Sequence, residues 1–175
     1  MFGRDPLADP ERLIRRVYAY VAYRIGDGPE AEDATSQTFE RALRYRKSYD
    51  PARGEPVSWL LGIARNVIAE GLSAPRLERV EAPDVEARGD LEQEAVERLS
   101  LAGALAQLDE RERELIALRY GADLTARRIG ELLGIKTNAA EVALHRALAR
   151  LRATLEEPVR ADDSEPLAQR RTVEL

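Results

Sequence analysis

The sequence predicts an all-α protein with two small helical domains joined by a flexible acidic linker, the C-terminal one being a helix-turn-helix. Three observations support this prediction. Ala, Leu, Arg and Glu, which favour helix, are abundant. Apolar residues recur at helical spacing in two blocks, and between them the periodicity fades around Pro75 and Pro83. We therefore expect domains over residues 9–72 and 93–156, a linker over 73–92 and a disordered tail over 157–175.

The helices of the first domain have clear starts. Asp9 supplies a capping oxygen, and Pro10 fits the first helical turn. Pro29 opens a second helix, and Pro56 opens a third after a loop rich in turn-forming residues, Ser48–Glu55. The core stripe expected along the third helix is Trp59, Leu60, Ile63 and Val67.

The second domain begins with a leucine-rich helical pattern. Asp109 and Glu112 then stand at the spacing of a capping box, and Gly121 is expected to close the helix that they start. A short amphipathic segment ends at Gly134, and a longer one opens at Thr137 or Asn138. Small residues, Gly130 and Ala140, stand where two helices would cross closely. This layout predicts a helix-turn-helix, whose second helix lies in the DNA major groove.

Charge is unevenly distributed along the chain. The net charge of −5 at pH 7 comes from the expected linker and tail, because acidic and basic residues nearly balance over 1–72 and 97–156. Since affinity for DNA depends largely on neutralising phosphates, we expect weak binding by the isolated protein.

Several functional classes have little support. The chain has no cysteine, its single histidine lacks an evident partner, and no Gly-rich phosphate loop is present. We expect no metal, no cofactor and no catalysis. The longest uncharged apolar-rich run, Val57–Ala64, is too short to span a bilayer, and the first ten residues lack a signal core. A cytoplasmic protein without membrane insertion is expected.

Two blocks of the chain carry a family resemblance. The first contains AEDATSQTFERALRY and WLLGIARNVI, and the second contains LDERERELIALRY and LHRALARLR. In this order they resemble the second and fourth conserved regions of extracytoplasmic-function (ECF) sigma factors, in the sigma-70 family of bacterial RNA polymerase. The resemblance implies a protein that directs core polymerase to specific promoters and initiates transcription. It also implies an anti-sigma factor as a partner.

The resemblance implies that the polar face of the second helix binds the β′ clamp of polymerase, while the second domain touches the β flap. A solvated helix face is the plainer interpretation of the same residues. The motif spacing favours docking for the first two candidates and leaves the two arginines open. The four candidates are Asp33, Gln37, Arg41 and Arg44.

The loop after the second helix, together with the third helix, resembles the part that opens the minus-ten promoter element. Melting needs a pocket for unstacked bases, cations for the backbone and polar groups for base edges. Asn66 is the best candidate for reading a base, whereas the spacing of Trp59 with Ile63 favours core packing over stacking. The candidates are Tyr49, Arg53, Trp59, Arg65 and Asn66.

The helix-turn-helix would read the minus-thirty-five element. Its first helix offers two arginines for phosphates. Glu141 could accept a hydrogen bond from cytosine, but its spacing from Asn138 favours a capping box. His145 suits a backbone contact or a plain exposed position. The candidates are Arg127, Arg128, Lys136, Thr137, Asn138, Glu141, His145 and Arg146.

The chain departs from the family pattern in two places. Acidic Glu70 and a break at Pro75 stand where members often carry basic residues, and Glu141 and Ala143 replace basic or polar residues of the recognition helix. These departures slightly favour an alternative, a sigma-like decoy that binds an anti-sigma factor without initiating. The Trp59–Asn66 block argues against it. A stand-alone helix-turn-helix regulator would leave the first domain unexplained.

Overall fold

The protein was analysed as a computed structural model, which describes residues 5–73 and 90–156. Within these ranges it contains helices and no strands. Most of the linker expected over 73–92, and the whole tail expected over 157–175, lie outside the described residues. At the edges of that linker the described residues are helical, since one helix continues to Ser73 and the next begins at Asp90.

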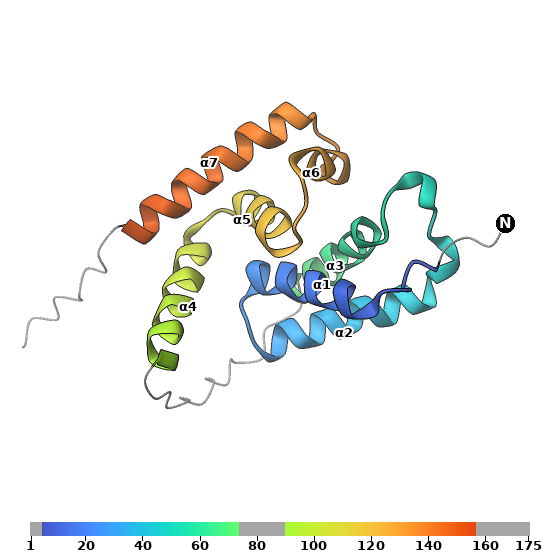
Figure 1. Cartoon of the computed structure of the whole chain (residues 1–175), viewed down its shortest axis with the longest axis horizontal. Coiled ribbons are helices and arrows are strands. Elements are labelled where there is room, and N and C mark those ends of the chain that lie inside the picture. The colour runs from blue at the N-terminus through green and yellow to red at the C-terminus, as the bar shows by residue number, and fades with distance from the viewer. Residues whose placement is uncertain (1–4, 74–89, 157–175) are drawn as a thin grey trace, which may run out of the picture.

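The first unit is a three-helix bundle joined by a looped segment (Figure 1). The predicted starts are confirmed: the Asp9 carboxylate accepts a hydrogen bond from the Arg12 amide at 3.3 Å, and proline begins every helix. Between the second and third helices the chain makes two 3₁₀ turns, η1 (Arg46–Ser48) and η2 (Pro51–Arg53). The helices are α1 (Pro10–Ile25), α2 (Pro29–Arg44) and α3 (Pro56–Ser73).

In the second unit, the long helix α7 packs against α4, α5 and α6 (Figure 1). The predicted capping box is confirmed, because the Glu112 amide donates to Asp109 Oδ1 at 2.7 Å and the Asp109 amide donates to Glu112 Oε2 at 3.2 Å. The elements are α4 (Asp90–Gln107), α5 (Glu110–Ile116), η3 (Ala117–Gly121), α6 (Ala126–Leu133) and α7 (Thr137–Glu156).

The end of α5 widens into the π-helical turn η3, which the sequence did not indicate. The Ala122 amide donates to the Ala117 carbonyl at 2.9 Å, the five-residue bond of a π turn. Gly121 ends this turn against the backbone of α1. A Cβ atom at Gly121 would stand 2.8 Å from the carbonyl oxygen of Ala19 and 2.8 Å from the Cα of Tyr20. Only glycine permits this approach.

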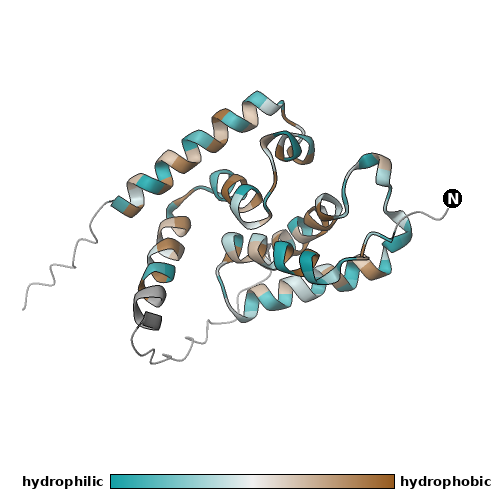
Figure 2. Cartoon of the chain, in the orientation of Figure 1, coloured by the Kyte–Doolittle hydropathy of each residue, from teal (hydrophilic) through white to brown (hydrophobic). Residues whose placement is uncertain are grey.

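The helix-turn-helix is formed by α6 and α7, and its predicted turn is confirmed. Gly134 ends α6 with a left-handed φ of 69°, which glycine adopts without strain. A Cβ atom at Gly130 would stand 2.7 Å from the carbonyl oxygen of Ile135. Gly130 therefore allows α6 to lie close to the backbone of the turn that precedes α7. Ala140 is fully buried. Figure 2 shows the alternating polar and apolar bands that α7 carries as an amphipathic helix.

The two units share a hydrophobic core. Val17, Tyr20 and Leu61 of the first unit belong to the same buried cluster as Leu115 and Leu118 of the second. The packing of α1 against η3 makes this connection. A second, smaller cluster lies between α4, α5 and α7. No helix in the described part of the chain is long and apolar enough to cross a bilayer.

We expect Leu118→Ala to lower the free energy of unfolding by about 2–5 kcal/mol, because it removes a fully buried side chain from the shared core. Leu99→Ala is the matched control, since Leu99 is 73% exposed and its loss should change stability by less than about 0.5 kcal/mol. Urea unfolding followed by circular dichroism measures both. Equal effects of the two substitutions would contradict the shared core.

Candidate nucleic-acid interface

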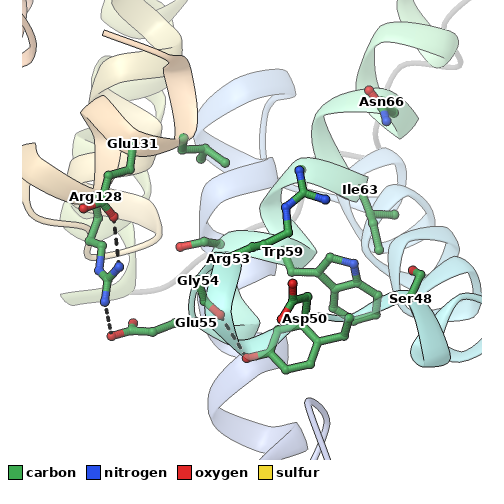
Figure 3. Close-up of a pocket in the computed structure, with 14 residues that line it drawn as sticks. Ser48, Asp50, Arg53, Gly54, Glu55, Trp59, Ile63, Asn66, Arg128 and Glu131 are labelled. Atoms are coloured by element: carbon green, nitrogen blue, oxygen red, sulfur yellow. Dashed lines mark hydrogen bonds and ion pairs between the residues drawn. The ribbon is translucent and has the colours of Figure 1, made fainter. Parts of the chain in front are cut away.

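A cavity of about 440 Å³ lies where the loop between α2 and α3 meets the first half of α3. Four of the five minus-ten candidates line it: Tyr49, Arg53, Trp59 and Asn66. Figure 3 labels the last three of them. Their convergence agrees with the sequence-based expectation of a pocket in this segment.

Tyr49 and Trp59 form the aromatic part of the cavity. Their ring centroids are 5.5 Å apart with the planes tilted by 58°, and the Tyr49 hydroxyl donates to the Gly54 carbonyl at 3.0 Å. Burial, with the nearby negative charges of Glu55 and Asp50, raises the pKa of Tyr49. The phenol therefore keeps its proton to a higher pH than an ordinary tyrosine does. Trp59 packs against the shared core and also lines the cavity, so its two interpretations do not exclude each other.

One face of α3 lines the cavity beyond the aromatic pair of Tyr49 and Trp59. Trp59, Ile63 and Asn66 are spaced at three and four residues, and all three line the cavity. Asn66 is exposed, and its carboxamide offers both donors and an acceptor. An unstacked base could therefore meet aromatic surface and an amide on the same helix face.

Arg65 lies apart from the other minus-ten candidates. Its Nε is 3.0 Å from Oε1 of Glu114 in α5, and it does not line the cavity. Glu114 was not singled out by the sequence analysis. No local pattern connects the two residues, because they come from different units.

The cavity is closed on one side by α6. Arg128, Glu131 and Leu132 line it together with the residues of the first unit. Arg128 forms ion pairs of 3.0 Å with Glu55 and 2.9 Å with Glu131, as Figure 3 shows. The sequence analysis missed both carboxylates. The three-residue spacing of Arg128 and Glu131 is a local signal that could have revealed one of them.

The arginines expected at DNA phosphates are thus paired within the protein. Arg127 Nε lies 3.0 Å from Oε1 of Glu131. Hydrogen bonds from Arg127 and then Arg128 lower the pKa of Glu131, and the hydrogen bond to Glu131 together with the charge of Glu55 raises the pKa of Arg128. In this arrangement carboxylates occupy some of the guanidinium donors that phosphates would use.

The start of α7 corrects the expected role of Glu141. The helix begins at Thr137, and the Ala140 amide donates to the Lys136 carbonyl at 3.0 Å. Asn138 therefore lies inside the first turn and is not the cap, so the capping box with Glu141 is wrong. Ala143 is half-buried against the core. Thr137 is half-buried too, and the exposed candidates of this helix and its approach are Lys136, Asn138, Glu141, His145 and Arg146.

On α2, the structure separates the two motif residues from the two arginines. Asp33 and Gln37 are exposed. Arg41 instead donates two hydrogen bonds, of 2.8 and 2.6 Å, to the carboxylate of Glu70 in α3. These bonds lower the pKa of Glu70. They also join α2 to α3 through the acidic residue that departs from the family pattern. Arg44 lies 3.2 Å from Glu40, one turn earlier on α2.

Two family models match the chain. The model of sigma-70 region 2 matches residues 11–75, and that of sigma-70 region 4 matches residues 104–153. The first covers the three-helix bundle, and the second covers the end of α4 through most of α7.

Curated relatives match most of the chain. It is 30% identical over 82% of its length to the ECF RNA polymerase sigma factor BldN of Streptomyces coelicolor, and the match spans 58% of that protein. It is 30% identical to SigL of Mycobacterium tuberculosis, with 81% of this chain and 83% of SigL covered. It is 31% identical to CarQ of Myxococcus xanthus, with 83% and 86% covered.

Two solved structures have a similar fold. The sigma factor RpoE of Bartonella quintana, crystallised with the anti-sigma factor NepR, matches with a TM-score of 0.62 at 18% identity, covering 83% of this chain and 92% of that one. CnrH, in complex with the cytosolic domain of CnrY, matches with a TM-score of 0.60 at 23% identity, covering 83% and 81%.

The corrected start of α7 gives a direct test. We expect Glu141→Ala to change the free energy of unfolding by less than about 0.5 kcal/mol, because Glu141 is exposed and caps nothing. Asp109→Ala should cost about 1 kcal/mol, because it removes a formed capping box. Thermal unfolding of the two variants checks this. A larger loss at Glu141 than at Asp109 would restore the capping role.

Proposed function

Because the chain belongs to the ECF group of sigma-70 factors, we propose that it directs core RNA polymerase to specific promoters and starts transcription there. The observation that carries the proposal is the convergence of Tyr49, Trp59 and Asn66 on one cavity in a chain that also has a helix-turn-helix. A stand-alone regulator would have no use for that cavity.

At the minus-ten element, the cavity would receive an unstacked base of the melted strand. Tyr49 and Trp59 supply aromatic surface, which holds bases with little regard to sequence. Asn66 supplies the donor and acceptor that distinguish base edges. Arg53, which lines the same cavity, is suited to the strand's phosphates.

At the minus-thirty-five element, α7 would lie in the major groove. Glu141 is exposed on the first half of that helix and can accept a hydrogen bond from the amino group of cytosine. Lys136 and Arg146 would contact the flanking phosphates. With nearly balanced charge in this unit, affinity for DNA would come mainly from joining two weak sites through polymerase.

Polymerase would be bound by both units. The exposed residues Asp33 and Gln37 of α2 would contact the β′ clamp, and the second unit would contact the β flap. Arg41 is a weaker candidate, because Glu70 already holds its guanidinium. The protein would bind and melt DNA without catalysing a reaction, and it would act in the cytoplasm, where polymerase works.

The second candidate function is a decoy that binds an anti-sigma factor and does not initiate. The observation in its favour is the recognition helix. There the acidic Glu141 stands where family members often carry a basic or polar residue, and Ala143 packs against the core. An anti-sigma factor is a proposed partner under either function.

Run-off transcription separates these functions. The purified protein is mixed with core polymerase and a library of genomic promoters, and transcripts are sequenced. We expect transcripts from a defined promoter set, absent with core polymerase alone. Failure to form a complex with core polymerase would refute the sigma function. Complex formation without initiation would favour the decoy.

Asn66→Ala should change the promoter preference at the minus-ten element while leaving polymerase binding intact. Loss of one hydrogen-bonded base contact should reduce discrimination by about 1–3 kcal/mol at one base position. The measurement is the promoter profile beside the affinity for core polymerase. Asp33→Ala is the matched contrast, expected to weaken polymerase binding and keep the profile. An unchanged profile for Asn66→Ala would remove this residue from the site.

A further inference from the structure

Gly62 lies in the interior of α3 and lines the candidate base cavity. Glycine weakens a helix interior, because it loses more conformational freedom on folding than alanine does. Packing among the described residues does not require it here, since a Cβ atom at Gly62 would meet nothing within 4 Å. Gly121 and Gly130 differ, because a Cβ atom there would collide with main-chain atoms. The helix is therefore weakened at a position where the fold itself does not need glycine.

The cavity distinguishes Gly62 from two other helical glycines. A Cβ atom at Gly71 or Gly103 would also meet nothing within 4 Å. Both of these residues are exposed, and neither belongs to the lining of the cavity, whereas Gly62 is half-buried beside it. The space next to Gly62 is therefore part of the cavity, and the space next to the other two lies at the open surface.

Two polar side chains flank Gly62 on the same face of the helix. Ser58 stands four residues before it and Asn66 four residues after it, so the three follow one another along about 12 Å of α3. All three line the cavity. Within the described residues, neither the Ser58 hydroxyl nor the Asn66 carboxamide forms a hydrogen bond. The neighbouring row of the helix carries Trp59 and Ile63, which Figure 3 shows beside the cavity and which supply apolar surface.

We propose that Gly62 and Ser58 complete the base site: the unstacked base lies against the main chain of α3 at Gly62, with its polar edge between Ser58 and Asn66. This inference rests on the proposed function, because it needs a melted strand. Without a side chain at Gly62, a flat ring reaches van der Waals contact with the helix backbone. The hydroxyl and the carboxamide each offer a donor and an acceptor, which suits the edge of a base.

Alanine at this position should have opposite effects on folding and on binding. Gly62→Ala should raise the ratio of folded to unfolded protein about two- to fivefold, because alanine is the better helix former. Its methyl group would stand in the cavity and hold the base away from the backbone. Since overfilling a close contact weakens it, the affinity for the melted strand should fall at least about fivefold. Gly103→Ala is the matched control, with a similar gain in stability and unchanged affinity.

Binding is measured with the holoenzyme, the complex of the full chain with core polymerase. The probe is the single-stranded minus-ten oligonucleotide of a promoter found by run-off transcription, and fluorescence anisotropy gives its dissociation constant. Each nucleotide is then replaced in turn by an abasic site. At the position whose base occupies the cavity, the difference between Gly62→Ala and wild type should shrink to less than about twofold, because the clashing base is gone. At the other positions the difference should persist.

Ser58→Ala tests the contact with the edge of the base. Strands that carry each of the four bases at the identified position are compared. The variant should lower affinity for the preferred base at least about fivefold and change affinity for the other three less than about twofold, because edge contacts discriminate between bases. Ser100→Ala, at an exposed position of α4, is the matched control and should leave all four affinities unchanged.

Three results would overturn the proposal. Gly62→Ala could bind the strand as tightly as wild type, its loss of affinity could persist at every abasic position, or it could unfold more easily than wild type. Equal losses for all four bases would remove Ser58 from the site. If the wild-type chain forms no holoenzyme, the proposed function fails and this inference fails with it. A wild-type holoenzyme that binds the strand, beside an unaffected Gly62→Ala, refutes this inference alone.

Discussion

The packing of α1 against the turn at Gly121 is the constraint on which the rest of the structure depends. It brings Glu114 within reach of Tyr20 and Arg24, and it merges the apolar faces of two helical units into one cluster. From that contact the chain has only a few residues before α6 begins, so the position of α6 follows from it. The lining of the minus-ten cavity follows in turn, since the first unit supplies most of it and Arg128, Glu131 and Leu132 of α6 complete it.

Local chemistry made the helices predictable. A proline at each start of the first unit, the Asp109–Glu112 capping box and the left-handed Gly134 each act within a few residues, so the sequence displays them directly. The capping error at Glu141 has the same origin. A three-residue spacing satisfies the pattern in any register. The helix begins two residues earlier than a cap at Asn138 requires, and this places Asn138 in the first turn.

The candidate site was predictable only where it is contiguous. The loop and the α3 face carry Tyr49, Trp59 and Asn66 within one segment, and they do meet at one cavity. By contrast, Arg65 with Glu114 and Glu55 with Arg128 pair residues from separate blocks of the chain. Such pairs leave no periodic trace in the sequence, because their two residues come from separate units.

The π turn η3 also determines how far the helix-turn-helix is rotated relative to α5. An α-helix advances about 100° per residue, and a π turn accommodates one residue more than an α-helical turn would. Removing one residue between Ala117 and Gly121 would restore α-helical geometry and rotate everything beyond it by about that angle relative to α5. The extra residue therefore sets the rotation of the helix-turn-helix about the axis of α5. This rotation determines the side of the molecule on which the recognition surface lies.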